Sequence, residues 1–79
     1  MGFFKKRGKP RQYRITQRAG SFGYLLYELE VWDKALRFWA FCDLQGTYKD
    51  NALDMLRKYA ALDAKVKGYG DNYEITEVL

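Results

Sequence analysis

The sequence contains no histidine, one cysteine and one proline in 79 residues. Without histidine, the commonest general base and every imidazole-based triad are missing, which disfavours familiar hydrolytic chemistry. The single thiol, Cys42, cannot form an internal disulfide, and a zinc site would have to be built from this one good ligand and carboxylates. These absences exclude disulfide scaffolds and structural zinc sites. They predict a non-enzymatic protein that binds a partner and needs no cofactor or metal.

Long apolar runs are also missing, because the chain is 48% hydrophobic and 30% charged with the charges scattered through it. A membrane span needs about 20 mostly apolar residues. No apolar run of the kind found in signal peptides follows the basic residues near the start. We therefore expect a single soluble domain in the cytoplasm, where a free thiol stays reduced, without a membrane partner. A nuclear or host-cell location also fits this composition.

Positive charge is concentrated in the first 18 residues, which hold seven bases and no acid. These bases are Lys5, Lys6, Arg7, Lys9, Arg11, Arg14 and Arg18. Residues 19–79 hold seven bases and ten acids, so the net charge of +4 originates at the start of the chain. Clustered lysine and arginine attract phosphates and release counterions from nucleic acid. The asymmetry predicts a polyanionic partner, with solubility as the alternative role of the charge.

The chain divides into an arm and a domain. Residues 1–11 contain Pro10 and two of the seven glycines, and they show neither helical nor strand periodicity. This composition predicts a flexible basic N-terminal arm. Residues 12–79 are then expected to form one α+β domain.

Three alternating segments after the arm predict β-strands at residues 12–18, 24–32 and 36–44. Short turns between them favour an antiparallel meander. The apolar series of the second and third strands should face the core. Its members are Leu25, Tyr27, Leu29, Val31, Leu36, Phe38, Ala40, Cys42 and Leu44.

A helical period replaces the alternation after Gly46 and continues to residue 67. The apolar stripe expected to cover the sheet consists of Ala52, Met55, Leu56, Tyr59, Leu62 and Val66. Gly68 is placed to end the helix in a left-handed conformation. Residues 73–79 alternate and predict a short fourth strand. The predicted fold is an α+β two-layer sandwich of order βββαβ.

Because one helix covers only one face of a sheet, the other face should carry exposed aromatic side chains. The expected members are Tyr24, Trp32, Trp39 and Phe41, interleaved with Arg14, Arg18 and Arg37. Flat aromatic surface beside positive charge suits the stacking of bases. The same face also carries Glu28, Glu30 and Asp43, which would repel phosphates. A large apolar patch also suits a protein partner or a second copy of the chain, and partial cover of the face by the arm or the C-terminal strand is a third alternative.

The leading hypothesis is a small basic protein that binds RNA or DNA with low sequence specificity, because no GXXG loop or aromatic RNP pattern is present. In it, Lys5, Lys6, Arg7, Lys9 and Arg11 attract phosphate, Arg14, Arg18 and Arg37 position the strand, and Trp32, Trp39 and Phe41 stack. The alternative is a protein-interaction module that uses the same aromatic face. Such a module would be a homodimer or an inhibitor or adaptor of a larger assembly, of the kind that phages and mobile elements encode.

Overall fold

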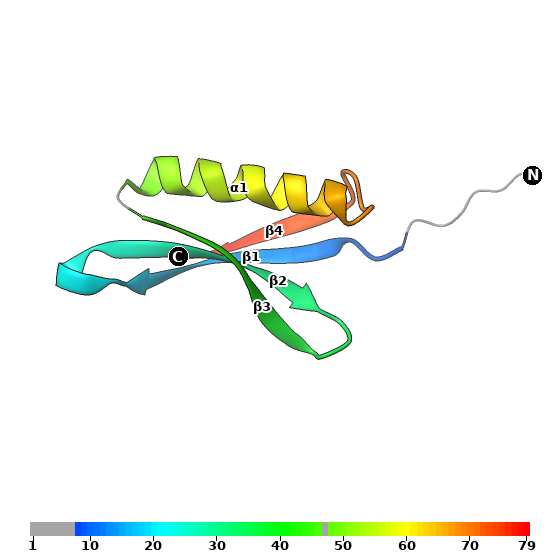
Figure 1. Cartoon of the computed structure of the whole chain (residues 1–79), viewed down its shortest axis with the longest axis horizontal. Coiled ribbons are helices and arrows are strands. Elements are labelled where there is room, and N and C mark those ends of the chain that lie inside the picture. Colours follow the sequence, from blue (N-terminus) through cyan, green and yellow to red (C-terminus); the bar gives the residue numbers. More distant parts are fainter. Residues whose placement is uncertain (1–7, 47) are drawn as a thin grey trace, which may run out of the picture.

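The structure, a computed structural model, describes residues 8–46 and 48–79. Most of the predicted basic arm, with Lys5, Lys6 and Arg7, lies outside the described residues. The elements follow in the order β1 (Arg11–Ala19), η1 (Ser21–Gly23), β2 (Leu25–Asp33), β3 (Phe38–Gly46), α1 (Lys49–Val66) and β4 (Tyr73–Val78). This order confirms the predicted α+β fold, with the helix on one side of a sheet (Figure 1). Arg11, assigned to the arm from the sequence, is the first residue of β1.

The four strands form one sheet in the spatial order β3-β2-β1-β4. β1 pairs antiparallel with β2, and β2 with β3, so the predicted meander is confirmed. β4 pairs with β1 in the parallel direction, because the helix carries the chain along the sheet before the last strand begins. The sheet is therefore mixed, and β3 and β4 are its two edges.

The C-terminus of α1 is fixed by backbone hydrogen bonds around Gly68, whose φ is +86°. The N–H of Gly68 donates to the carbonyl of Lys65 at 3.1 Å, and the N–H of Tyr69 donates to the carbonyl of Ala64 at 2.8 Å. This pair of bonds is the Schellman motif, in which glycine adopts the left-handed conformation at low cost. The predicted end of the helix at this glycine is confirmed. The motif turns the chain back toward β4.

The core lies between α1 and the middle of β1 and β2. Its buried residues are Tyr13, Ile15, Tyr27, Leu29, Ala52, Leu53, Leu56, Ala60 and Ala64. The predicted helix stripe was wrong at Leu62 and Val66, which are 58% and 81% exposed. Ala60 and Ala64 take the buried positions instead, because their small side chains let the helix pack close to the sheet. The apolar pattern in the sequence gives most weight to large side chains, so it does not detect a helix face made of alanines.

The inward face predicted for the second and third strands also needs correction. Leu25, Leu36 and Phe38 are exposed, because the β1–β2 hairpin extends past the end of the helix and the β2–β3 hairpin bends away from it (Figure 1). A β-bulge shifts the register so that Leu29 lies opposite Asp43 and Glu30 opposite Phe41, which leaves Cys42 as the extra residue. From Asp43 onward, the residues of β3 therefore face the side of the sheet opposite to the one that the alternation in the sequence predicts. Leu44 consequently lies opposite Glu28, on the face away from the helix.

Candidate nucleic-acid interface

The sheet divides into two ribbons at one end. Pairing between β1 and β2 stops at Tyr13 and Val31. Beyond this pair, residues 11–12 remain paired with β4, and residues 32–33 remain paired with β3. We call this separation of β1 from β2 the fork. On one side of the fork, the β2–β3 hairpin bends away from the helix (Figure 1).

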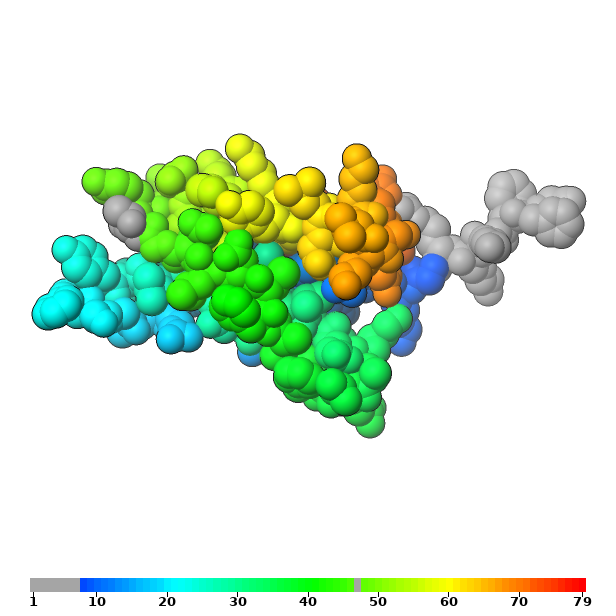
Figure 2. Space-filling view, viewed as in Figure 1, coloured from blue at the N-terminus to red at the C-terminus, as the bar shows by residue number. Residues whose placement is uncertain are grey.

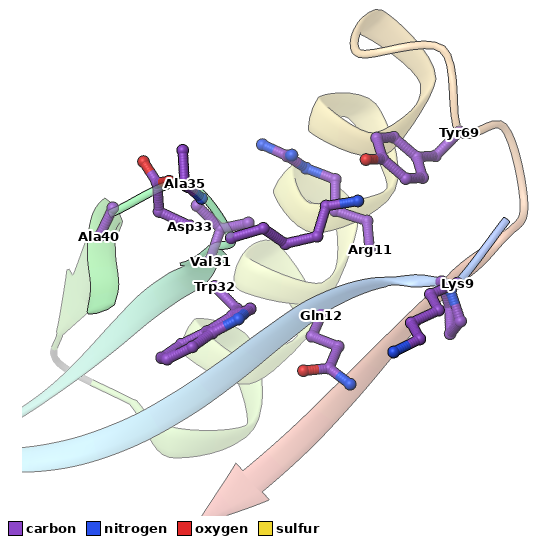
Figure 3. Close-up of a pocket in the computed structure, with 11 residues that line it drawn as sticks. Lys9, Arg11, Gln12, Val31, Trp32, Asp33, Ala35, Ala40 and Tyr69 are labelled. Carbon is purple, nitrogen blue, oxygen red and sulfur yellow. Dashed lines mark hydrogen bonds between the residues drawn. The ribbon is translucent and has the colours of Figure 1, made fainter. Parts of the chain in front are cut away.

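A cavity of about 520 Å³ occupies the fork. Figure 2 shows its opening between the β2–β3 hairpin and the start of β1. The polar and aromatic residues that line it include Lys9, Arg11, Gln12, Trp32, Lys34 and Tyr69 (Figure 3). The predicted site residues Lys9, Arg11 and Trp32 are thus brought together. Lys34 was not predicted, because nothing in its local sequence indicates that β1 and β2 separate beside it.

Arg11 is held by side chains of the fold. Its Nε donates to Oδ2 of Asp63 at 3.0 Å and to the hydroxyl of Tyr13 at 2.8 Å. Its Cζ lies 5.6 Å from the centroid of the Tyr13 ring and 5.5 Å from that of Tyr69, within cation–π range. Much of its charge is therefore compensated internally, and Arg11 positions the start of β1 and the wall of the cavity.

Arg14 is paired on the face away from the helix. It binds Glu30 through two hydrogen bonds, Nε to Oε1 at 2.9 Å and Nη2 to Oε2 at 3.3 Å. Its Cζ also lies 4.5 Å from the centroid of a Trp39 ring. The sequence places these three side chains on one face, as the structure does, but the arginine covers the ring that was expected to stack on bases. Glu30 compensates the charge that was expected to contact phosphate.

The remaining aromatic side chains do not form one continuous platform. Trp32 packs edge to face against Trp39, with 5.4 Å between the ring centroids. Phe41 lies on the same face and is 63% exposed. Tyr24, which is 66% exposed, lies next to the β1–β2 turn, at the other end of the sheet from the fork (Figure 1). Arg18 donates to Glu28 at 3.0 Å and is therefore also paired.

Arg37 ends the turn between β2 and β3 in a left-handed conformation, with φ of +57°. Its N–H donates to the carbonyl of Asp33 at 2.7 Å, while Oδ1 of Asp33 accepts the N–H groups of Ala35 and Leu36. This conformation costs a residue with a side chain roughly 1 kcal/mol relative to glycine. Among the described residues, no acid forms an ion pair with Arg37 or with Lys34 of the same turn.

Cys42 is half-buried beside the core. Burial raises the pKa of its thiol, and the carboxylates of Asp63 and Asp43 raise it further. The thiol therefore stays protonated and weakly nucleophilic at neutral pH. Within the described part of the chain, no three His, Cys, Asp or Glu residues are grouped to hold a metal ion. No described helix has the length and apolar character needed to cross a membrane.

Compared with known proteins, the chain matches no family model, no curated protein and no solved structure.

Proposed function

We propose that this protein binds nucleic acid with low sequence specificity through the cationic end of the molecule, around the fork. The observation that supports this most strongly is a set of cations there that form no ion pair with a described residue. Lys9 and Lys34 line the cavity, Arg37 ends the adjacent turn, and no described acid pairs with any of the three. Elsewhere on the sheet, the arginines are paired with carboxylates.

The basic N-terminal segment strengthens the argument from charge. Lys5, Lys6 and Arg7 precede Lys9 in the sequence, so three further cations are close to Lys9 along the chain. Contacts between lysine or arginine and phosphate carry no sequence information, which accounts for the low specificity. The proposal assigns Arg14 and Arg18 a structural role, and it assigns the aromatic contacts to Trp32 and Phe41.

Fluorescence anisotropy across a salt series tests the proposal, with short single-stranded RNA, single-stranded DNA and duplex DNA as ligands. The double variant Lys34→Gln/Arg37→Gln should reduce the slope of log affinity against log salt by about 0.7 to 0.9 for each phosphate that the protein no longer neutralises. The control Lys49→Gln/Lys58→Gln removes the same charge from α1, and it should leave the slope nearly unchanged. Equal effects of the two variants, or no binding at low salt, would refute the proposal.

A second candidate function, a protein-interaction module, is favoured by the opposite end of the molecule. Phe22 is 98% exposed and adopts a left-handed conformation with φ of +57° in the β1–β2 turn. Tyr24 and Tyr48 are 66% and 72% exposed. Exposed aromatic side chains on a short turn are typical of protein contacts.

Sedimentation equilibrium at two salt concentrations tests this second candidate in its homodimer form. Phe22→Ser should weaken self-association, and the association should depend little on salt. Leu62→Ser is the matched control, because Leu62 is also exposed but lies on α1. A monomer at all concentrations would exclude the homodimer.

A further inference from the structure

The fork places Gln12 of β1 at the wall of the cavity. The N–H of Arg11 donates to the carbonyl of Asn72 at 3.1 Å, on the side of β4. Successive residues of a strand direct their backbone groups to opposite sides, so the backbone groups of Gln12 point toward β2, whose pairing with β1 ends at Tyr13 and Val31. The side-chain amide of Gln12 supplies the cavity with hydrogen-bond donors and an acceptor.

The charged lining of the fork favours an anion. Lys9, Arg11 and Lys34 line the cavity against a single acid, Asp33. Oδ1 of Asp33 is already occupied by two N–H groups of its own turn. Arg11 is paired with Asp63, whereas Lys9 and Lys34 have no ion-pair partner among the described residues.

The aromatic lining adds a flat apolar surface. Trp32 contributes its indole ring to the cavity, and Val31 and Ala40 contribute aliphatic surface. In Figure 3, Arg11 and Tyr69 lie on one side of β1 and Gln12 on the other, whereas Trp32 projects from β2 into the space between β2 and β1. The cavity thus reaches both faces of the sheet. Its volume of about 520 Å³ falls within the range of small-molecule sites.

We propose that the fork cavity binds one nucleoside phosphate, with the phosphate group at Lys9 and Lys34 and the base against Trp32. This inference rests on the proposed function and adds to it the way in which a single nucleotide is held. The cations recognise the phosphate, the indole stacks on the planar ring, and the side-chain amide of Gln12 hydrogen-bonds to the edge of the base. The same chemistry is present in a free mononucleotide and in the terminal nucleotide of a strand.

Titration of the ¹⁵N-labelled full-length protein with adenosine 5′-monophosphate tests the site, because the indole N–H signal of Trp32 reports on the cavity. The chain has two tryptophans, and the indole signal that is missing from the spectrum of the Trp32→Phe variant is that of Trp32. The signal should shift on titration, and the affinity should fall about tenfold in Lys34→Gln, which removes one charge-assisted hydrogen bond. The matched control Lys58→Gln, with an exposed lysine on α1, should bind like the original protein.

Two further ligands separate the recognition of phosphate from that of the base. Adenosine should bind more weakly than the monophosphate and should be unaffected by Lys34→Gln. Inorganic phosphate that binds as tightly as the monophosphate would overturn the inference, because the base would then contribute nothing. Comparison of a pentanucleotide that carries a 5′-phosphate with the same pentanucleotide that ends in a 5′-hydroxyl distinguishes the two sources of the ligand. Tighter binding of the phosphorylated form would identify the end of a strand as the ligand. Equal binding of the two forms would identify a free mononucleotide.

Oligonucleotide anisotropy on the same samples distinguishes the failure of this inference from that of the proposed function. An unmoved Trp32 signal, together with intact salt-dependent oligonucleotide binding, would overturn the nucleotide site alone. Absence of both responses would overturn the site and the proposed function together. Equal weakening by Lys34→Gln and Lys58→Gln would show that only net charge matters, and it would also overturn the site.

Discussion

The hydroxyl of Tyr13 donates a hydrogen bond of 2.5 Å to Oδ2 of Asp63, which joins the first strand to the last turn of the helix. Tyr13 is 1% exposed, so its hydroxyl has little access to water. Tyr13→Phe removes one of the donors to the carboxylate and leaves Arg11 as the other. We expect the free energy of unfolding to fall by about 1 to 2 kcal/mol, measured by urea denaturation.

Tyr73→Phe is the control for this prediction, because the hydroxyl of Tyr73 has no hydrogen bond among the described residues while its ring packs on Tyr13 at 6.0 Å. Burial and the bond to Asp63 raise the pKa of the Tyr13 hydroxyl. The protonated hydroxyl therefore stabilises the fold below about pH 10, the ordinary tyrosine value, and this contribution disappears as the pH rises further. The stability difference between the original protein and Tyr13→Phe should shrink above that pH. A constant difference would contradict the assignment.

The ion pairs of Arg14 and Arg18 can be compared with each other, since each arginine binds a glutamate of β2. Glu30 is only 9% exposed, so Arg14→Ala would leave a nearly buried carboxylate with Thr16 as its remaining side-chain donor. We expect a decrease of about 2 kcal/mol in the free energy of unfolding. Arg18→Ala breaks a more exposed pair and should cost less than about 0.5 kcal/mol. Equal decreases would show that the pairing with Glu30 is not what stabilises this face.

The ion pair between α1 and β4 should make stability depend on acid pH. Arg57 donates to both carboxylate oxygens of Glu77, at 2.7 and 3.0 Å, and these hydrogen bonds lower the pKa of Glu77. The contribution is present above about pH 4.3, the unfolded value for glutamate, and it disappears as the pH falls through the folded-state pKa. Glu77→Gln should therefore reduce stability at pH 7, by less than about 1 kcal/mol because the pair is exposed, and should have little effect at pH 2.

Glu74→Gln provides the matched control on the same strand, because no described base pairs with Glu74. Thermal unfolding of both variants at pH 7 and pH 2 is the measurement. An effect of Glu77→Gln that is equally large at the two pH values would contradict an electrostatic origin.

The order of strands and helix along the chain could be predicted from the sequence, because it depends on local patterns. Alternation over residues 12–18 and 24–32 requires only that one face of each strand be buried, and Gly68 has a conformational reason to end the helix. The bulge at Cys42 and the parallel pairing of β4 could not be predicted. Both depend on register between strands that no local pattern fixes.

The same distinction applies to the candidate site. Arg14, Glu30 and Trp39 could be placed on one face from their spacing. That the glutamate pairs with the arginine, and that the arginine then covers the ring, is a cross-strand relationship that follows from the register of β1, β2 and β3. Lys34 has no signal in the sequence beyond its charge, because the cavity that it lines exists only where two strands separate.

Two leucines of α1 test the orientation of the helix, which the apolar pattern predicted only in part. Leu56 is fully buried in the core, whereas Leu62 is 58% exposed. Leu56→Ala should lower the free energy of unfolding by about 2 to 5 kcal/mol, because it removes buried surface and leaves a cavity. Leu62→Ala should cost less than about 0.5 kcal/mol, since little surface is returned to water and alanine favours the helix. Urea denaturation of the two variants measures both values, and comparable decreases would mean that the helix packs on the sheet through the larger aliphatic stripe and not through Ala60 and Ala64.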